Sequence, residues 1–214
     1  MAKKNQGKNA AKAITQKKSS STPASKNRQV VVRAPQSMSI RSLTPRSGEV
    51  RVEMVMEVKS GFNSFVLHPD NIHWLKGVAP SYQQWQLSNI KMWYEPRVAT
   101  STNGQVSMAF LPDFEDDTQS IRSLEGLTRI SGACRGAPWD KLSLSPPRSR
   151  LINYVNLTKF NGMSGTDKND RALGQLLAYA DMDASFPSSS VVGRVYLQYV
   201  PVLKGATDPA TQSG

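Results

Sequence analysis

Residues 1–48 of this chain contain no aspartate and no glutamate, although eleven of the 27 lysines and arginines lie there. Residues 49–214 hold the other sixteen basic residues and all sixteen acidic ones. The formal charge of +11 therefore belongs to the first quarter of the chain, which is a basic tail on a neutral body. The eleven cations are Lys3, Lys4, Lys8, Lys12, Lys17, Lys18, Lys26, Arg28, Arg33, Arg41 and Arg46.

Aromatic residues are also missing from this tail, because the first one in the chain is Phe62. Up to Gln29 the only sizeable apolar side chains are those of Met1 and Ile14. Such a segment cannot bury enough apolar surface to offset the entropy lost when a chain becomes ordered. We therefore predict a disordered basic arm over residues 1–29.

A flexible polycation binds phosphate polymers by releasing their counterions, and it needs no base sequence to do so. The eleven cations are therefore the candidate nucleic-acid-binding residues. The simplest alternative is a tail that only aids solubility. Nuclear targeting would need a denser basic cluster than Lys17-Lys18. A mitochondrial presequence would be arginine-rich and amphipathic, whereas the seven basic residues up to Lys26 are all lysines.

Residue types that serve catalysis and metal binding are scarce. Cys134 is the only cysteine, which excludes an intrachain disulfide and suits a reducing compartment. The two histidines, His68 and His73, flank Asp70, but Pro69 interrupts any helix that would align them, so packing is the better interpretation. No glycine-rich phosphate loop or nucleophile elbow is present. We therefore expect neither an enzyme nor a protein with a small-molecule substrate.

No apolar run approaches the eighteen or so residues that cross a membrane, and no hydrophobic signal peptide opens the chain, so no membrane partner is expected. Residues 30–48 form a connector with one β-prone patch, Val30 to Val32, followed by Pro35. Residues 49–214 are long enough for one domain with a full core.

The domain has the alternation of β-strands. Every second residue from Val50 to Val58 is apolar, which predicts one buried face over 50–58. The same period appears over 105–110, while 192–203 is apolar on both faces and predicts a central strand. Further strands are expected near 62–68, 87–98, 127–133, 150–157 and 173–180, with short helices at 81–86 and 117–125.

Eight such strands predict an all-β fold, either a sandwich or a barrel. The connections are long and rich in proline, glycine and serine, which favours an eight-stranded antiparallel jelly-roll sandwich with short helices in its connections. Trp74, Trp85, Trp93 and Trp139 could stack on bases, but they alternate with other apolar positions and are better interpreted as core or interface residues.

Four carboxylates crowd into the five residues from Asp113 to Asp117. They repel one another unless a cation compensates them, and hard oxygen ligands on a loop suit Ca²⁺. An acidic loop leading into a helix N-terminus is an equally good interpretation, because the helix dipole favours negative charge there. Both remain open at this point.

The stretch from His73 to Phe110 contains a series of weak motifs in a fixed order. His73-Trp74-Leu75 is followed by Val78-Ala79-Pro80-Ser81-Tyr82 and Trp85, then by Trp93-Tyr94-Glu95-Pro96 and by a Thr-rich turn at 100–104. An apolar strand and Asp113-x-x-Asp116 complete it. In this order the chain is similar to the shell domain of coat proteins of small icosahedral plant RNA viruses, of the tombusvirus, sobemovirus and luteovirus type. The likeness is best over 48–145.

The resemblance implies a jelly-roll capsid protein that self-assembles into an icosahedral shell, of the T=3 kind, around viral single-stranded RNA. It implies that the arm lies inside the virion, and that assembly takes place in the host cytoplasm. It also implies calcium between subunits, with Asp113 and Asp116 as metal ligands and Asp208 as a further candidate. In such shells a segment like 30–35 can become ordered in one class of subunit; a linker in every subunit is the equal alternative.

Two other functions stay open. One is a non-capsid RNA-binding module with a basic tail. The other is a jelly-roll carbohydrate-binding or enzyme domain whose tail is incidental. The formation of closed particles distinguishes the capsid protein from both.

Overall fold

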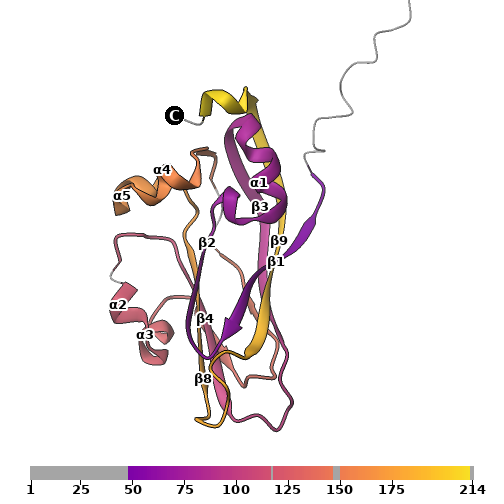
Figure 1. The fold of residues 1–214 in the computed structure, drawn as a ribbon, viewed down its shortest axis with the longest axis vertical. Helices are drawn as coiled ribbons and strands as arrows, with labels where there is room; N and C mark the ends of the chain where they lie inside the picture. Colours follow the sequence, from indigo (N-terminus) through magenta and orange to yellow (C-terminus); the bar gives the residue numbers. More distant parts are fainter. Residues whose placement is uncertain (1–47, 117, 147–149, 213–214) are drawn as a thin grey trace, which may run out of the picture. The chain divides into compact units, whose positions relative to one another are not determined.

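The strands form two facing antiparallel sheets (Figure 1). The computed structural model describes residues 48–116, 118–146 and 150–212. One sheet has the order β1 (Arg51–Lys59), β9 (Val191–Ala206), β3 (Tyr82–Pro96) and β6 (Leu142–Leu144), with the short β7 (Ile152–Asn153) also paired to β3. The other has the order β2 (Gly61–Val66), β8 (Gln175–Met182), β4 (Gly104–Leu111) and β5 (Cys134–Gly136).

This strand order is that of a jelly roll, because β1 pairs with β9 and β2 pairs with β8, so each sheet joins strands from opposite ends of the chain. The predicted antiparallel jelly-roll sandwich is confirmed. β9 lies between β1 and β3, as its two apolar faces predicted. The core between the sheets contains Trp85, Tyr94, Met108 and Leu197, each at most 1% exposed.

Short helices lie in the connections, as expected. They are η2 (Pro69–Asn71), α1 (His73–Val78), η3 (Ala79–Ser81), α2 (Thr118–Ile121), α3 (Leu124–Thr128), α4 (Leu157–Asn161), α5 (Gly165–Asn169) and η4 (Pro209–Gln212). None of the helices in the described ranges is long and apolar enough to span a membrane.

The prediction of a buried apolar face along β1 is right only for its second half. Met56 and Val58 are buried, whereas Val50, Val52 and Met54 are 56, 52 and 47% exposed. The pairing of β1 with β9 shifts by one residue between Met54 and Met56. Such a bulge moves the preceding side chains to the opposite face of the sheet.

Two predicted elements are wrong in type. The helix expected at 81–86 is the start of β3, where Trp85 and Leu87 alternate into the core. The strand expected at 127–133 is replaced by α3 and turns, because Ser123 caps a helix by accepting a bond from the Gly126 N–H at 3.0 Å. The extended chain resumes only at Cys134, in β5.

The helix expected at 117–125 and the strand expected at 150–157 are both shorter than predicted. The first is divided into α2 and α3 by the cap at Ser123. The second has only the two residues of β7, since the Asn156 side chain accepts a bond from the Lys159 N–H at 2.8 Å and starts α4. In each case a side-chain cap decides where the helix begins.

Candidate functional site

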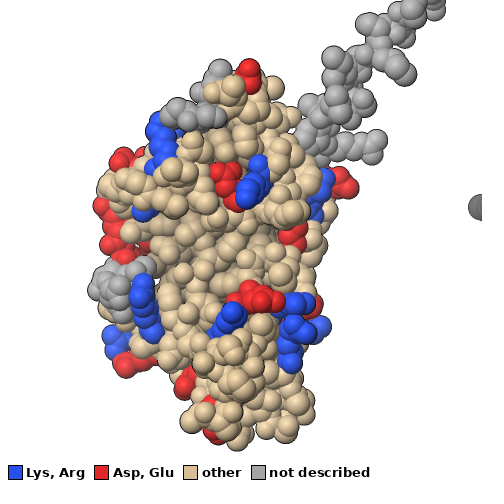
Figure 2. All heavy atoms as spheres, viewed as in Figure 1, with Lys and Arg blue, Asp and Glu red and all other residues tan. Residues whose placement is uncertain are grey.

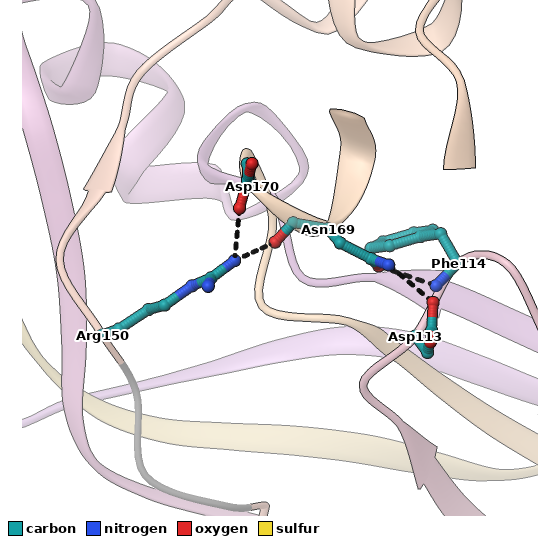
Figure 3. A network of polar contacts seen from close by, with 5 residues as sticks. All are labelled: Asp113, Phe114, Arg150, Asn169 and Asp170. Atoms are coloured by element: carbon teal, nitrogen blue, oxygen red, sulfur yellow. Dashed lines mark hydrogen bonds and ion pairs between the residues drawn. The ribbon is translucent and has the colours of Figure 1, made fainter. Parts of the chain in front are cut away.

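The acidic loop begins directly after β4, where Pro112 ends the strand. Asp113 Oδ1 accepts hydrogen bonds from the Glu115 N–H at 2.8 Å and from Asn169 Nδ2 at 2.6 Å. Asn169 Oδ1 in turn accepts a bond from the Phe114 N–H at 2.8 Å. One asparagine side chain from α5 therefore holds the backbone and the first carboxylate of the loop together (Figure 3).

The same corner is bound to the rest of the fold by two further groups. Arg150, in the connection before β7, donates to the Asn169 carbonyl and forms an ion pair with Asp170 at 3.2 Å (Figure 3). Thr166 of α5 donates to the Glu115 carboxylate. The loop after β4 is thus attached to α5 by bonds at both Asp113 and Glu115.

These bonds keep Asp113 ionised. The Glu115 N–H, and then the Asn169 amide, lower the pKa of Asp113 below its ordinary value. A carboxyl whose pKa is lowered in the folded state contributes its stability above its ordinary pKa and loses it only as the pH falls through the lowered one. Asp113 is therefore a charged carboxylate throughout the neutral and alkaline range.

Asp113 and Asp116, the two predicted calcium ligands, line two adjoining pockets that share Phe110 and Pro112. Asp113 lines a pocket of ≈ 370 Å³ together with Arg150 and Asn169. Asp116 lines a second pocket of ≈ 770 Å³ together with Arg129. No cluster of three acidic, histidine or cysteine side chains is found among the described residues. One copy of the chain does not gather a complete set of calcium ligands in that part of the structure.

Asp208, the third calcium candidate, precedes η4, and its Oδ1 accepts a bond from the Ala210 N–H at 3.0 Å.

The acidic loop was predicted from the density of carboxylates in the sequence. Asn169 and Arg150 were missed, because they lie 56 and 37 residues away from Asp113 in the sequence. Only the pattern Ser164-x-x-Asp167 hinted at a capped helix there, and it says nothing of what that helix contacts.

His68 is a packed residue of the core. It is 0% exposed, and its ring lies 4.8 Å from that of Phe160 and 6.4 Å from that of Trp85. Its Nδ1 accepts a bond from the Asp70 N–H at 3.3 Å, while the Asp70 carboxylate accepts bonds from Tyr154 and Leu157. Burial lowers the pKa of His68. The interpretation of His68 as a packed residue holds.

The eleven basic arm residues, and the β-prone patch at 30–35, lie outside the described residues. The face drawn in Figure 2 shows basic and acidic side chains of the domain side by side. Four ion pairs link such side chains in the described ranges, among them Arg194–Glu57 at 3.1 Å. The described surface thus agrees with a body of zero net charge.

The tryptophans were expected to be core or interface residues. Trp85 is fully buried, and the Trp93 ring stacks on the Tyr196 ring with their centres 5.8 Å apart.

Comparison with known proteins decides the family. Residues 9–209 match the family model of the viral coat protein S domain. The chain belongs to the viral coat protein S-domain family. The family model covers the jelly-roll domain and most of the basic arm. The resemblance to coat protein shell domains, drawn from the motifs between His73 and Asp116, is confirmed.

Curated relatives agree. The chain is 26% identical over 160 residues to the capsid protein of Cucumber necrosis virus, covering 71% of this chain and 38% of the relative. It is 26% identical over 146 residues to the capsid protein of Pothos latent virus (isolate Pigeonpea/India), covering 66% and 36%. The chain thus matches less than two fifths of the length of these relatives. They are structural proteins, and the expectation that the S-domain chain is not an enzyme is confirmed.

Solved structures of virus particles share the fold. Tobacco necrosis virus matches with a TM-score of 0.67 at 17% identity, over 76% of this chain and 84% of that one. Cocksfoot mottle virus matches with a TM-score of 0.66 at 15% identity, over 77% and 97%. The jelly roll of the S-domain chain is therefore the shell fold of icosahedral plant viruses.

Proposed function

We propose that this chain is a capsid protein whose copies form a T=3 icosahedral shell around viral single-stranded RNA. Its basic arm lines the inside of that shell. The observation that carries the proposal is the separation of charge, because a tail of +11 precedes an S domain with equal numbers of basic and acidic residues. A neutral body lets many copies pack side by side, while the tail binds phosphate.

The amount of charge fits this use. A T=3 shell holds about 180 copies in closed symmetry. Arms of charge +11 would then supply about 2,000 positive charges, which offset a similar number of phosphates by counterion replacement. A virion built in the host cytoplasm, where RNA is available and thiols stay reduced, agrees with the single cysteine.

Particle formation tests this function. The purified chain mixed with single-stranded RNA at low salt is expected to form uniform spheres of roughly 30 nm, the size of a T=3 shell of domains this large. Negative-stain microscopy and sedimentation measure this. A chain that stays monomeric or dimeric at every salt concentration and pH would be a non-capsid RNA-binding module instead.

We also propose that calcium joins neighbouring subunits through Asp113 and Asp116. Two observations support this. Both hydrogen bonds that Asp113 accepts from described residues end on Oδ1, which leaves Oδ2 for a cation. Asp116 is exposed. Calcium accepts six to eight oxygens, so a site that starts from two carboxylates of one copy needs ligands from another. The two pockets that these carboxylates line share Phe110 and Pro112, so the carboxylates are near neighbours, as two ligands of one cation from the same copy must be.

A chelator at mildly alkaline pH is expected to lower the sedimentation coefficient of the particles, because uncompensated carboxylates repel one another. The double variant Asp113→Asn and Asp116→Asn should sediment identically with and without the chelator. Asp181→Asn, which removes an exposed carboxylate from β8, is the matched control and should respond like the parent. If the chelator does not change the sedimentation coefficient of the parent particles, the calcium proposal is refuted. The acidic loop is then a loop that precedes a helix N-terminus.

A further inference from the structure

The described residues expose three large hydrophobic side chains, and all three lie in the short segment 50–54 at the start of one strand. They are Val50, just before β1, and Val52 and Met54 within its first half. Single exposed apolar residues are ordinary on a protein surface. Three in alternate positions form a continuous stripe along one face, which we call the β1 stripe.

Contacts on the other face hold this half of the strand in place. The Arg51 guanidinium lies 3.7 Å from the centre of the Trp74 ring. Glu53 accepts bonds from the buried Tyr199 hydroxyl at 2.6 Å and from the Trp74 N–H at 3.2 Å. The charged residues therefore point inward and are held there, so the β1 stripe cannot turn inward without breaking these contacts.

The strand that carries the stripe is also at the edge of its sheet. β1 pairs with β9 on one side, and in the described ranges no strand pairs with its other side. In Figure 1, β1 is the first strand after the grey trace and crosses β9 in this view. An open edge offers backbone donors and acceptors to an added strand. Stripe and edge together present both side chains and backbone to a partner.

The residues of this segment are complementary to themselves. If two copies of β1 pair antiparallel with Val52 opposite Val52, then Val50 lies opposite Met54 and Arg51 lies opposite Glu53. Apolar residues thus meet on one face and opposite charges meet on the other, both of which stabilise a cross-strand pair. A twofold contact needs this property, because each surface must match itself.

We propose that the occupant of the β1 stripe is the β1 strand of a second copy, paired in this register about a twofold axis. The proposal rests on the proposed capsid function, which supplies neighbouring copies, and it names one contact between them. It also gives Arg51 Nε an acceptor, while Nη2 of the same guanidinium pairs with Glu49 at 3.3 Å. Arg51 Nε is buried and has no acceptor among the described residues, and the register places the second copy's Glu53 opposite it.

Cysteine cross-linking tests the register. Cys134 is the only native cysteine, so Cys134→Ser gives a background without thiols. Opposite residues of an antiparallel pair have Cα atoms about 4.5–5.5 Å apart, which lies within the range of about 4.4–6.8 Å found for disulfide-bonded cysteines. Val52→Cys in this background should therefore form a disulfide with itself. Val50→Cys should not, because its two copies would lie about 13 Å apart in this register; a mixture of Val50→Cys and Met54→Cys should cross-link.

The full-length chain is oxidised in assembled particles and also at high salt without RNA, and dimers are measured on non-reducing gels. Lys59→Cys, exposed on the same strand but outside the register, is the matched control. Val52→Cys is expected to cross-link at least about tenfold faster than this control. Equal rates for Val52→Cys and Lys59→Cys in intact particles overturn the β1 pairing and leave the capsid function standing. A parent chain that forms no particles overturns the capsid function, while the oxidation at high salt still decides the pairing.

Discussion

Particles assembled from a chain without residues 1–28 are expected to contain almost no RNA, and to be smaller or empty. Eight of the eleven arm cations lie in that segment, so the tail falls from +11 to +3. Each cation that binds a phosphate of single-stranded RNA contributes about 0.7 to the slope of log affinity against log salt. Removing eight of these cations therefore weakens binding by several orders of magnitude at moderate salt. The effect is measured as the amount of RNA extracted per particle and as the ratio of the particles' ultraviolet absorbance by nucleic acid to that by protein.

A length-matched control separates charge from chain length. In it, the eight basic residues of segment 1–28 are all replaced by glutamine, so the arm keeps its length and loses its charge. This variant should lose RNA as fully as the deletion does. If either variant packages as much RNA as the parent, the arm is not what binds the genome.

Gly193→Ala is expected to destabilise the domain by about 3 kcal/mol or more, the upper range for overpacking a core. A Cβ at Gly193 would lie 2.1 Å from the Tyr94 ring. That ring is fully buried, and its hydroxyl shares its one proton between the Pro138 carbonyl at 2.8 Å and the Val192 carbonyl at 3.2 Å. It cannot move aside without leaving buried groups unbonded.

Urea unfolding of the full-length chain, kept unassembled at high salt, measures the free energy of unfolding for this prediction. Gly77→Ala is the matched control, since a Cβ there meets nothing within 4 Å and Gly77 lies inside α1. Alanine in a helix should raise stability by up to about 1 kcal/mol over glycine. A Gly193→Ala chain as stable as the parent would mean that β9 and Tyr94 are not packed as described.

The strands could be predicted where the sequence pattern and the packing agree. β4 alternates, and β9 lies between β1 and β3, as the apolar residues on both of its faces predicted. β1 has the clearest alternation in the chain, yet its first half was assigned to the wrong face. The contacts that decide its orientation come from Trp74 and Tyr199, which are distant in sequence, and a local period cannot reveal them.

Only part of the candidate site could be predicted, because a local sequence pattern does not show contacts with residues that are distant in sequence. Carboxylates that crowd together at Asp113 to Asp117 are visible in the sequence itself. Asn169, which binds the loop through both atoms of its amide, lies on a helix that the sequence predicted as a connection. The end of α3, where a strand was expected at 127–133, and α4 after Asn156 were missed because side-chain caps outweighed β-propensity over a few residues.

A cryo-EM reconstruction of particles assembled from the full chain and single-stranded RNA tests the central claim most directly. It is expected to show a closed T=3 shell of S domains, with Gly48 on the inner surface and RNA density beneath it. A closed shell with Gly48 on its outer surface, or no closed shell at all, would contradict the account of a neutral shell lined by basic arms.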